Sequence, residues 1–119
     1  GIDPAALLAA HPRLVWCTIT GFGAASSRPG YDFVVQAERG WMAITGEAEG
    51  APMKVGVALV DVLTARDAAI AVLAALAARG LRREPLPADR RRLHVSLADT
   101  AAAALVNVAQ NALVSGHEA

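Results

Sequence analysis

Residues 55–80 read VGVALVDVLTARDAAIAVLAALAARG and carry the clearest structural signal in the chain. Residues 55–60 form a short apolar run, which predicts a strand or an extended segment. Residues 62–79 are rich in alanine, the best helix former, and Gly80 supplies a stop, so this part predicts one long helix. Asp61 lies directly between the two and would therefore stand at a junction of strand and helix.

The segments on either side continue the alternation of strands and helices. Residues 14–20 and 93–97 are rich in apolar and β-branched side chains and are typical of buried strands. Helices are expected over residues 4–10, 31–39 and 98–114. The resulting order is helix, strand, helix, strand, helix, strand, helix. This alternation favours an α/β fold with Rossmann-like layers.

Composition narrows the possible functions. The chain has 119 residues, 55% of them hydrophobic, and its formal net charge is zero. The length suits one small domain, and the neutral balance offers no electrostatic argument for nucleic acid or an anionic membrane as a partner. No stretch reaches the ~18 uninterrupted apolar residues that a membrane helix needs. We therefore expect no nucleic-acid partner and no membrane partner.

Cysteine and histidine indicate no metal site. Cys17 is the only cysteine, so no disulfide can form within the chain, and a reducing compartment such as the cytoplasm is expected. It lies inside the apolar residues 14–17, where a buried and inert thiol is the simplest interpretation. His11, His94 and His117 have no metal-ligand spacing with one another or with Cys17.

Two further features have simple interpretations. Gly21 and Gly23 follow an expected strand, but Arg28 to Gly30 intervene before the next helix, so the glycines indicate a tight loop rather than a dinucleotide site. An arginine cluster is typical of a solvated connection, with a phosphate-binding patch as the alternative. Its members are Arg79, Arg82, Arg83, Arg90, Arg91 and Arg92.

The position of Asp61 leaves two roles open. As a helix N-cap, its carboxylate would accept backbone N–H bonds. As a functional group, it would project into the crevice at the carboxyl end of the sheet. There the helix dipole would favour the ionised form, against a reference pKa of ~3.9. An ionised and positioned carboxylate can act as a covalent nucleophile.

Five motifs in one order resemble the core of the family III coenzyme-A transferases, the group that contains formyl-CoA, carnitine and bile-acid CoA transferases. The motifs are residues 17–23 (CTITGFG), 28–32 (RPGYD), 44–47 (ITGE), 52–61 (PMKVGVALVD) and 95–100 (VSLADT). The resemblance covers nearly all 119 residues. It implies that residues 1–119 are part of a large, Rossmann-like, CoA-binding domain, without the N-terminal and C-terminal portions of the family fold.

The same resemblance implies a reaction and a set of site residues. Members move CoA from an acyl-CoA donor to a carboxylic acid acceptor, and the aspartate matched by Asp61 forms the covalent aspartyl intermediate. Residues matched by Pro29, Gly30, Tyr31 and Asp32 line the CoA site. Coenzyme A or its thioester would be a substrate, and members form interlocked homodimers. We expect Asp61 to lie at the N-terminal end of the long helix, at least partly open to a cleft that it shares with Tyr31 and Asp32.

Tyr31 helps to separate two chemistries within the family. In the α-methylacyl-CoA racemases the matching position is a histidine that works as an acid or base. Tyrosine, with a reference pKa of ~10, is a poor base at neutral pH, so Tyr31 favours a transferase. An α-methylacyl-CoA racemase or other isomerase, or a non-catalytic fragment, remain alternatives. Ala65 stands where members commonly have glycine, the donor and acceptor acids are not identified, and we expect the chain to be inactive alone.

Overall fold

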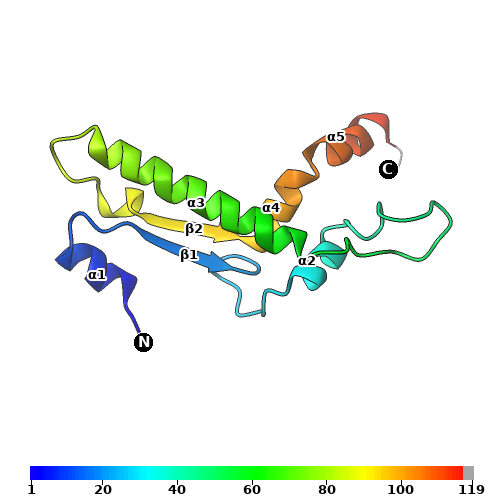
Figure 1. Cartoon of the computed structure of the whole chain (residues 1–119), viewed down its shortest axis with the longest axis horizontal. Coiled ribbons are helices and arrows are strands. Elements are labelled where there is room, and N and C mark those ends of the chain that lie inside the picture. Colours follow the sequence, from blue (N-terminus) through cyan, green and yellow to red (C-terminus); the bar gives the residue numbers. More distant parts are fainter. Residues whose placement is uncertain (117–119) are drawn as a thin grey trace.

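Two parallel strands form the centre of the structure, a computed structural model that describes residues 1–116 (Figure 1). Strand β1 (Trp16–Thr20) pairs with β2 (Arg92–Ser96), with Trp16 opposite Arg92 and Thr20 opposite Ser96. Because the strands are parallel, both carboxyl ends meet at one edge, where Gly21 and Leu97 follow them. The two strands expected near residues 14–20 and 93–97 are therefore confirmed.

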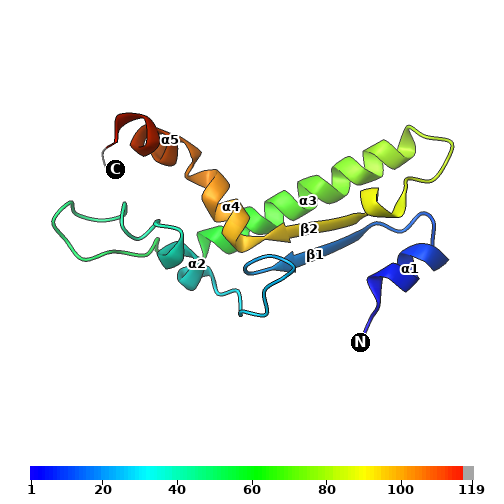
Figure 2. The same cartoon turned by 180° about the vertical axis from the view of Figure 1, so that it is seen from behind.

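Helices connect and cover the strands. They are α1 (Pro4–Ala10), α2 (Asp32–Glu38), α3 (Leu59–Gly80), α4 (Leu97–Ala104) and α5 (Val106–Ser115), with a 3₁₀ turn η1 at Ala88–Arg90. The long helix α3 runs along both strands, and α1 lies on their other side (Figures 1 and 2). This layering confirms the α/β expectation, although the described residues form two strands rather than three.

The hydrophobic core lies where α2, α3 and α4 meet, at the carboxyl end of the strands. Its buried members are Val35, Trp41, Val60, Leu97 and Ala101. Val35, Val60 and Ala101 are each 0% exposed. The first turn of α3 is thus anchored through Val60, directly beside the residue expected to carry the chemistry.

The strand expected over residues 55–60 is wrong. Residues 55–58 are irregular, and α3 already begins at Leu59. These residues have no strand partner in the described structure, because the backbone N–H of Val55 bonds instead to the side chain of Gln36. An apolar run of this length does not distinguish a strand from the buried start of a helix.

The single helix expected over residues 98–114 is also wrong, since α4 and α5 meet at an angle of 59°. The indole Nε1 of Trp41 donates a 3.0 Å hydrogen bond to the carbonyl of Ala101. In a continuous helix that carbonyl would accept from Leu105, four residues on. Leu105 instead donates to Ala102 and packs against the core, so a tertiary contact bends the segment.

The loop between β1 and α2 closes through a direct contact of two glycines. A methyl group on Gly21 would lie 2.4 Å from the Cα of Gly30, and one on Gly30 would lie 2.4 Å from the Cα of Gly21. Real side chains do not approach a backbone this closely. The expectation that the glycines permit a tight loop is therefore confirmed, and the contact fixes where residues 29–32 lie.

Gly21→Ala should consequently destabilise the fold by about 1–3 kcal/mol, because the backbone of Gly30 would have to move. The measurement is chemical denaturation of the variant against the wild type. Gly80→Ala is the matched control, since its methyl group would meet nothing within 4 Å. Its stability should be unchanged or slightly higher, because alanine is the better helix former. Equal midpoints for both variants would contradict the glycine contact.

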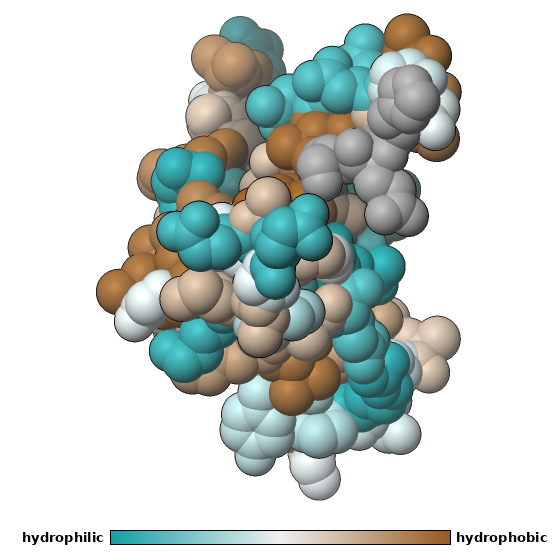
Figure 3. All heavy atoms as spheres, turned by 90° about the vertical axis from the view of Figure 1, so that its right-hand side faces the viewer, coloured by the Kyte–Doolittle hydropathy of each residue, from teal (hydrophilic) through white to brown (hydrophobic). Residues whose placement is uncertain are grey.

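Apolar side chains remain at the surface of the described chain. Figure 3 views the end that carries α2 and α5 and shows brown apolar groups among polar ones. On α3, Val62, Ile70 and Leu73 are 63%, 57% and 64% exposed, and Leu113 on α5 is 86% exposed. Among residues 1–116, no single helix has the length and apolarity to cross a membrane, whereas the bent pair α4 and α5 together does by those two measures.

Candidate functional site

Asp61 occupies the first turn of α3 and is exposed to solvent. It is the third residue of the helix, so the N-cap interpretation is wrong: Ala58 is the N-cap and makes no side-chain hydrogen bond. The side chain of Asp61 is thus not used to cap its own helix. The positive end of the helix dipole lies beside it and favours its ionised form.

Two local effects oppose the helix dipole and raise the pKa of the Asp61 carboxyl. Partial burial against its surroundings raises the pKa of Asp61, and the nearby carboxylate of Asp32 raises it further. Both effects disfavour the charged form, the first by removing water and the second by like-charge repulsion. A raised pKa leaves a more basic carboxylate once it is ionised.

A hydrogen-bond network links Asp61 to α2. Asp32 Oδ2 accepts from the backbone N–H of Asp61 at 2.9 Å, and Asp32 Oδ1 accepts from Gln36 Nε2. Gln36 Oε1 accepts from the backbone N–H of Val55 at 2.9 Å. Gln36 Nε2 also makes a long contact of 3.5 Å to the carbonyl of Val57. Asp32 and Gln36 therefore hold both ends of the irregular segment that leads into α3.

The segment expected to bind CoA lies beside this network. Pro29, Gly30 and Tyr31 are exposed, and Tyr31 is 68% exposed at the N-cap of α2. Asp32 is only 5% exposed, and its two oxygens face Gln36 and Asp61. The structure thus brings the segment next to the start of α3, as expected. Contact of these residues with CoA stays a prediction.

Charged groups outside the network support the loop that precedes this segment. Arg28 forms an ion pair with Glu38 on α2, and its guanidinium lies 4.0 Å from the ring centre of Phe22. The hydrogen bond from Arg28 lowers the pKa of Glu38. Both charged side chains are exposed, so the pair orients the loop more than it stabilises the fold.

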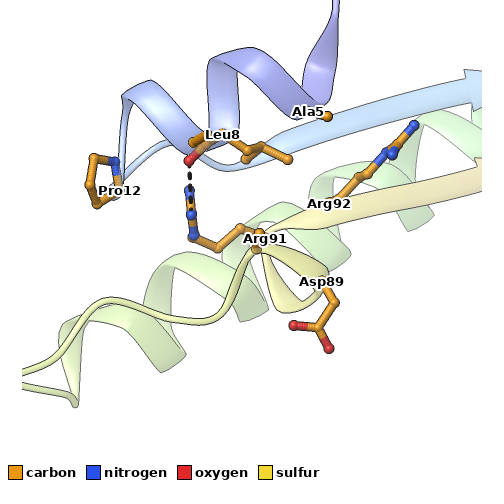
Figure 4. Close-up of a pocket in the computed structure, with 8 residues that line it drawn as sticks. Ala5, Leu8, Pro12, Asp89, Arg91 and Arg92 are labelled. Carbon is orange, nitrogen blue, oxygen red and sulfur yellow. Dashed lines mark hydrogen bonds between the residues drawn. The ribbon is translucent and has the colours of Figure 1, made fainter.

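A separate hollow of about 400 Å³ lies between α1 and η1 (Figure 4). Its lining includes Ala5, Leu8, Pro12, Asp89 and Arg91, and it is largely apolar. Arg91 directly precedes β2, so the hollow is at the amino ends of the strands. Asp61 lies at the opposite, carboxyl edge, and the hollow has no part in its chemistry.

Arg91 departs from the solvated connection expected for the arginine cluster. It is 5% exposed, and its guanidinium donates to the backbone carbonyls of residues 8, 11, 14 and 86 at 2.8 to 3.0 Å. Its hydrogen bond to Leu8 is drawn in Figure 4. Arg79 donates to the carbonyl of Arg13. The solvated interpretation fits the exposed Arg82, Arg83, Arg90 and Arg92.

No group of three or more metal-ligating side chains occurs among residues 1–116. His94 is exposed and lies 2.9 Å from the hydroxyl of Thr20. Cys17 is half-buried rather than fully buried. His117 lies outside the described residues.

Sequence reasoning missed Gln36, the largest fully buried side chain in the described chain. A signal was present, because Asp32 and Gln36 are four residues apart on an expected helix and such pairs can hydrogen-bond. Their shared contact with residues 55–61 has no such signal, since it joins segments far apart in sequence.

The chain matches known proteins along its whole length. The sequence model of CoA-transferase family III covers residues 1–119. A succinate–glutarate CoA-transferase of Agrobacterium fabrum is 38% identical over 119 residues, which are 98% of this chain and 28% of that protein. The succinyl-CoA:glutarate CoA-transferase of Mus musculus is 36% identical over 111 residues, 91% of this chain and 24% of its own length.

Solved structures show the same likeness. A CAIB/BAIF family protein from Brucella suis superposes with a TM-score of 0.84 at 36% identity, over 99% of this chain and 31% of that one. A hypothetical protein from Mycobacterium tuberculosis gives a TM-score of 0.79 at 31% identity, over 93% of this chain and 32% of its own. The chain therefore spans 24% to 32% of the length of these relatives.

Proposed function

Since this chain belongs to CoA-transferase family III, we propose that the protein containing it moves CoA from an acyl-CoA donor to a carboxylic acid acceptor, with Asp61 as the covalent nucleophile. The observation that carries the assignment of Asp61 is its placement. Its carboxylate is exposed on the first turn of α3, and its backbone is bonded to Asp32, next to the exposed Tyr31.

The proposed reaction has two halves, each with a balanced exchange of bonds. One Asp61 oxygen attacks the thioester carbonyl of the donor, and CoA leaves as a thiolate while a mixed anhydride forms. The thiolate then attacks the Asp61 carbonyl of this anhydride, which releases the donor acid and leaves an aspartyl-CoA thioester. The acceptor carboxylate then attacks that thioester, which expels the CoA thiolate and forms a second mixed anhydride. The thiolate attacks the acceptor carbonyl of this anhydride, which forms the product thioester and releases the Asp61 carboxylate.

Residues 29–32 form the proposed CoA-binding segment. Pro29, Gly30 and Tyr31 are exposed and can meet a ligand directly. Asp32 is buried and acts on the same site through the backbone of Asp61. Tyr31 would pack against or hydrogen-bond the thioester region rather than accept a proton.

The whole protein is expected to extend beyond this chain in domain, assembly and substrates. We place residues 1–119 in a large, Rossmann-like, CoA-binding domain, inside an interlocked homodimer in the cytoplasm. The exposed apolar side chains of α3 and α5 support further packing partners. The names of the relatives point to dicarboxylic acids, since they mention succinate, glutarate and mesaconate. Succinyl-CoA with glutarate is therefore the first substrate pair to test.

Incubation of the protein from the whole reading frame with succinyl-CoA should leave an adduct on Asp61, as an anhydride or an aspartyl-CoA thioester. Hydroxylamine should cleave the adduct and convert Asp61 to its hydroxamate, because both species are activated acyl groups. Peptide mass spectrometry detects the change. Asp67, on the same helix, serves as the internal control and should stay unmodified.

A racemase would give a different result in the same assay. It would exchange an α-proton of a 2-methylacyl-CoA with solvent and form no acyl-enzyme. Deuterium at the α-carbon, without CoA transfer to a second acid and without an Asp61 adduct, would overturn the transferase assignment.

A further inference from the structure

We propose that Asp32 and Gln36 form a buried clamp that positions Asp61 for attack, a role that rests on the proposed function. The clamp consists of these two side chains of α2 and their hydrogen bonds to the segment 55–61. Neither residue needs to touch the substrate. They are positioning residues, which act through the backbone that carries the nucleophile.

The first support is the complete burial of Gln36. Its side chain is 0% exposed, and a buried amide is stable only when its polar atoms have partners. Its partners are the carboxylate of Asp32, the backbone N–H of Val55 and, at a longer distance, the carbonyl of Val57. The N–H of Val55 requires an oxygen, which orients the amide and directs its nitrogen to Asp32. One side chain therefore joins α2 to the segment before α3.

The second support is the way in which α3 begins. The first backbone N–H groups of a helix have no partner within the helix, and a side chain at the N-cap commonly accepts from them. Ala58 is the N-cap here and cannot do so. Asp32, from another helix, accepts from the N–H of Asp61 instead. The group that caps α3 thus comes from another helix, and it bonds to the backbone of Asp61, the proposed nucleophile.

The third support is the lack of other order in this segment. Residues 55–58 belong to no helix or strand. Val60, the residue directly before Asp61, is buried in the core, so the clamp and Val60 together define where the carboxylate lies. Displacement of a reacting group by about 1 Å can lower a rate roughly 100-fold, so loss of the clamp should reduce kcat more than substrate binding.

A swap of the two side chains tests the clamp. Asp32→Asn keeps an oxygen for the Asp61 N–H but turns its NH₂ toward the NH₂ of Gln36. Gln36→Glu keeps an acceptor for Val55 but sets a carboxylate against that of Asp32. The double variant reverses the polarity: the new amide donates to the new carboxylate, and both backbone N–H groups keep an acceptor.

Each single variant should lower kcat for succinyl-CoA and glutarate by at least about tenfold, with KM for succinyl-CoA changed by less than about threefold. The double variant should recover to within about threefold of the wild type. Thr100→Val is the control, because it removes a hydrogen bond to Asp67 without touching the clamp. It should lower the melting temperature and leave kcat unchanged.

Single variants that keep the wild-type kcat well below their melting temperatures would overturn the clamp, as would a double variant no better than the singles. Hydrogen exchange at the amides of Val55 and Asp61 separates this outcome from failure of the proposed function. If the wild-type protein transfers no CoA, the proposed function is overturned, and so is the role of Asp32 and Gln36 in positioning a nucleophile. Loss of protection at Val55 in Gln36→Leu and at Asp61 in Asp32→Ala, which each remove the acceptor, would then still support the clamp as a structural tie, and unchanged protection in both would overturn that also.

Discussion

Asp61→Asn is expected to lower CoA transfer by at least about a thousandfold, because asparagine keeps the size and shape of the side chain but has no ionised oxygen to attack the thioester. The measurement is kcat for succinyl-CoA and glutarate in the protein from the whole reading frame. The assay should run well above the pKa of Asp61, which its partial burial and Asp32 raise, so that the wild-type carboxylate is fully ionised.

The control for this loss is the same substitution farther along the same helix. Asp67 accepts a hydrogen bond from Thr100, and an asparagine oxygen can accept it equally well, so Asp67→Asn should keep near wild-type activity. The affinity of the Asp61→Asn protein for CoA should also change little, since the proposed CoA-binding segment is intact. Retention of more than a tenth of the wild-type kcat would rule out Asp61 as the nucleophile.

Arg91→Met is expected to reduce the free energy of unfolding by about 3 kcal/mol or more, since methionine leaves several backbone carbonyls without their charged donor. Arg91 ties the end of α1 and the strand entrances together through residues 8, 11 and 14. Its loss should therefore loosen the amino ends of the sheet. Chemical denaturation, followed by circular dichroism, measures the change.

Arg90→Met provides the matched comparison one residue earlier. The side chain of Arg90 is 77% exposed, and its contact to Asp89 is 3.9 Å long. Its removal should change stability by no more than about 0.5 kcal/mol. If the two variants unfold at the same denaturant concentration, the buried hydrogen bonds of Arg91 do not stabilise the fold as described.

The local pattern was sufficient for most elements. Alanine content and a terminal glycine predicted the body of α3, and apolar β-branched runs predicted β1 and β2. These signals are short-range, because helix propensity and side-chain alternation act between residues close in sequence. The motif order also identified the family correctly, and the match over residues 1–119 confirms it.

The role of Asp61 is one feature that its neighbouring residues in the sequence do not determine. From residues 55–61 alone, a helix N-cap was the simpler interpretation of Asp61, and the family resemblance favoured a nucleophile. The structure removes the first role, because the helix begins at Leu59 and its cap comes from Asp32. Because the Asp61 carboxylate does not cap α3, it can face solvent. Residues 55–61 alone do not reveal this, because the capping group, Asp32, lies on another helix.

The sequence by itself therefore determined the body of α3, the strands β1 and β2, and the family, and it nominated Asp61 and residues 29–32 as candidate site residues. The tertiary structure alone decided the bend at Leu105, the burial of Arg91, and the attachment of the Asp32 and Gln36 clamp to residues 55–61. Each of these depends on a hydrogen bond between groups far apart in sequence, such as Trp41 with Ala101. Such bonds form only after the chain has folded, because burial removes water as the competing partner.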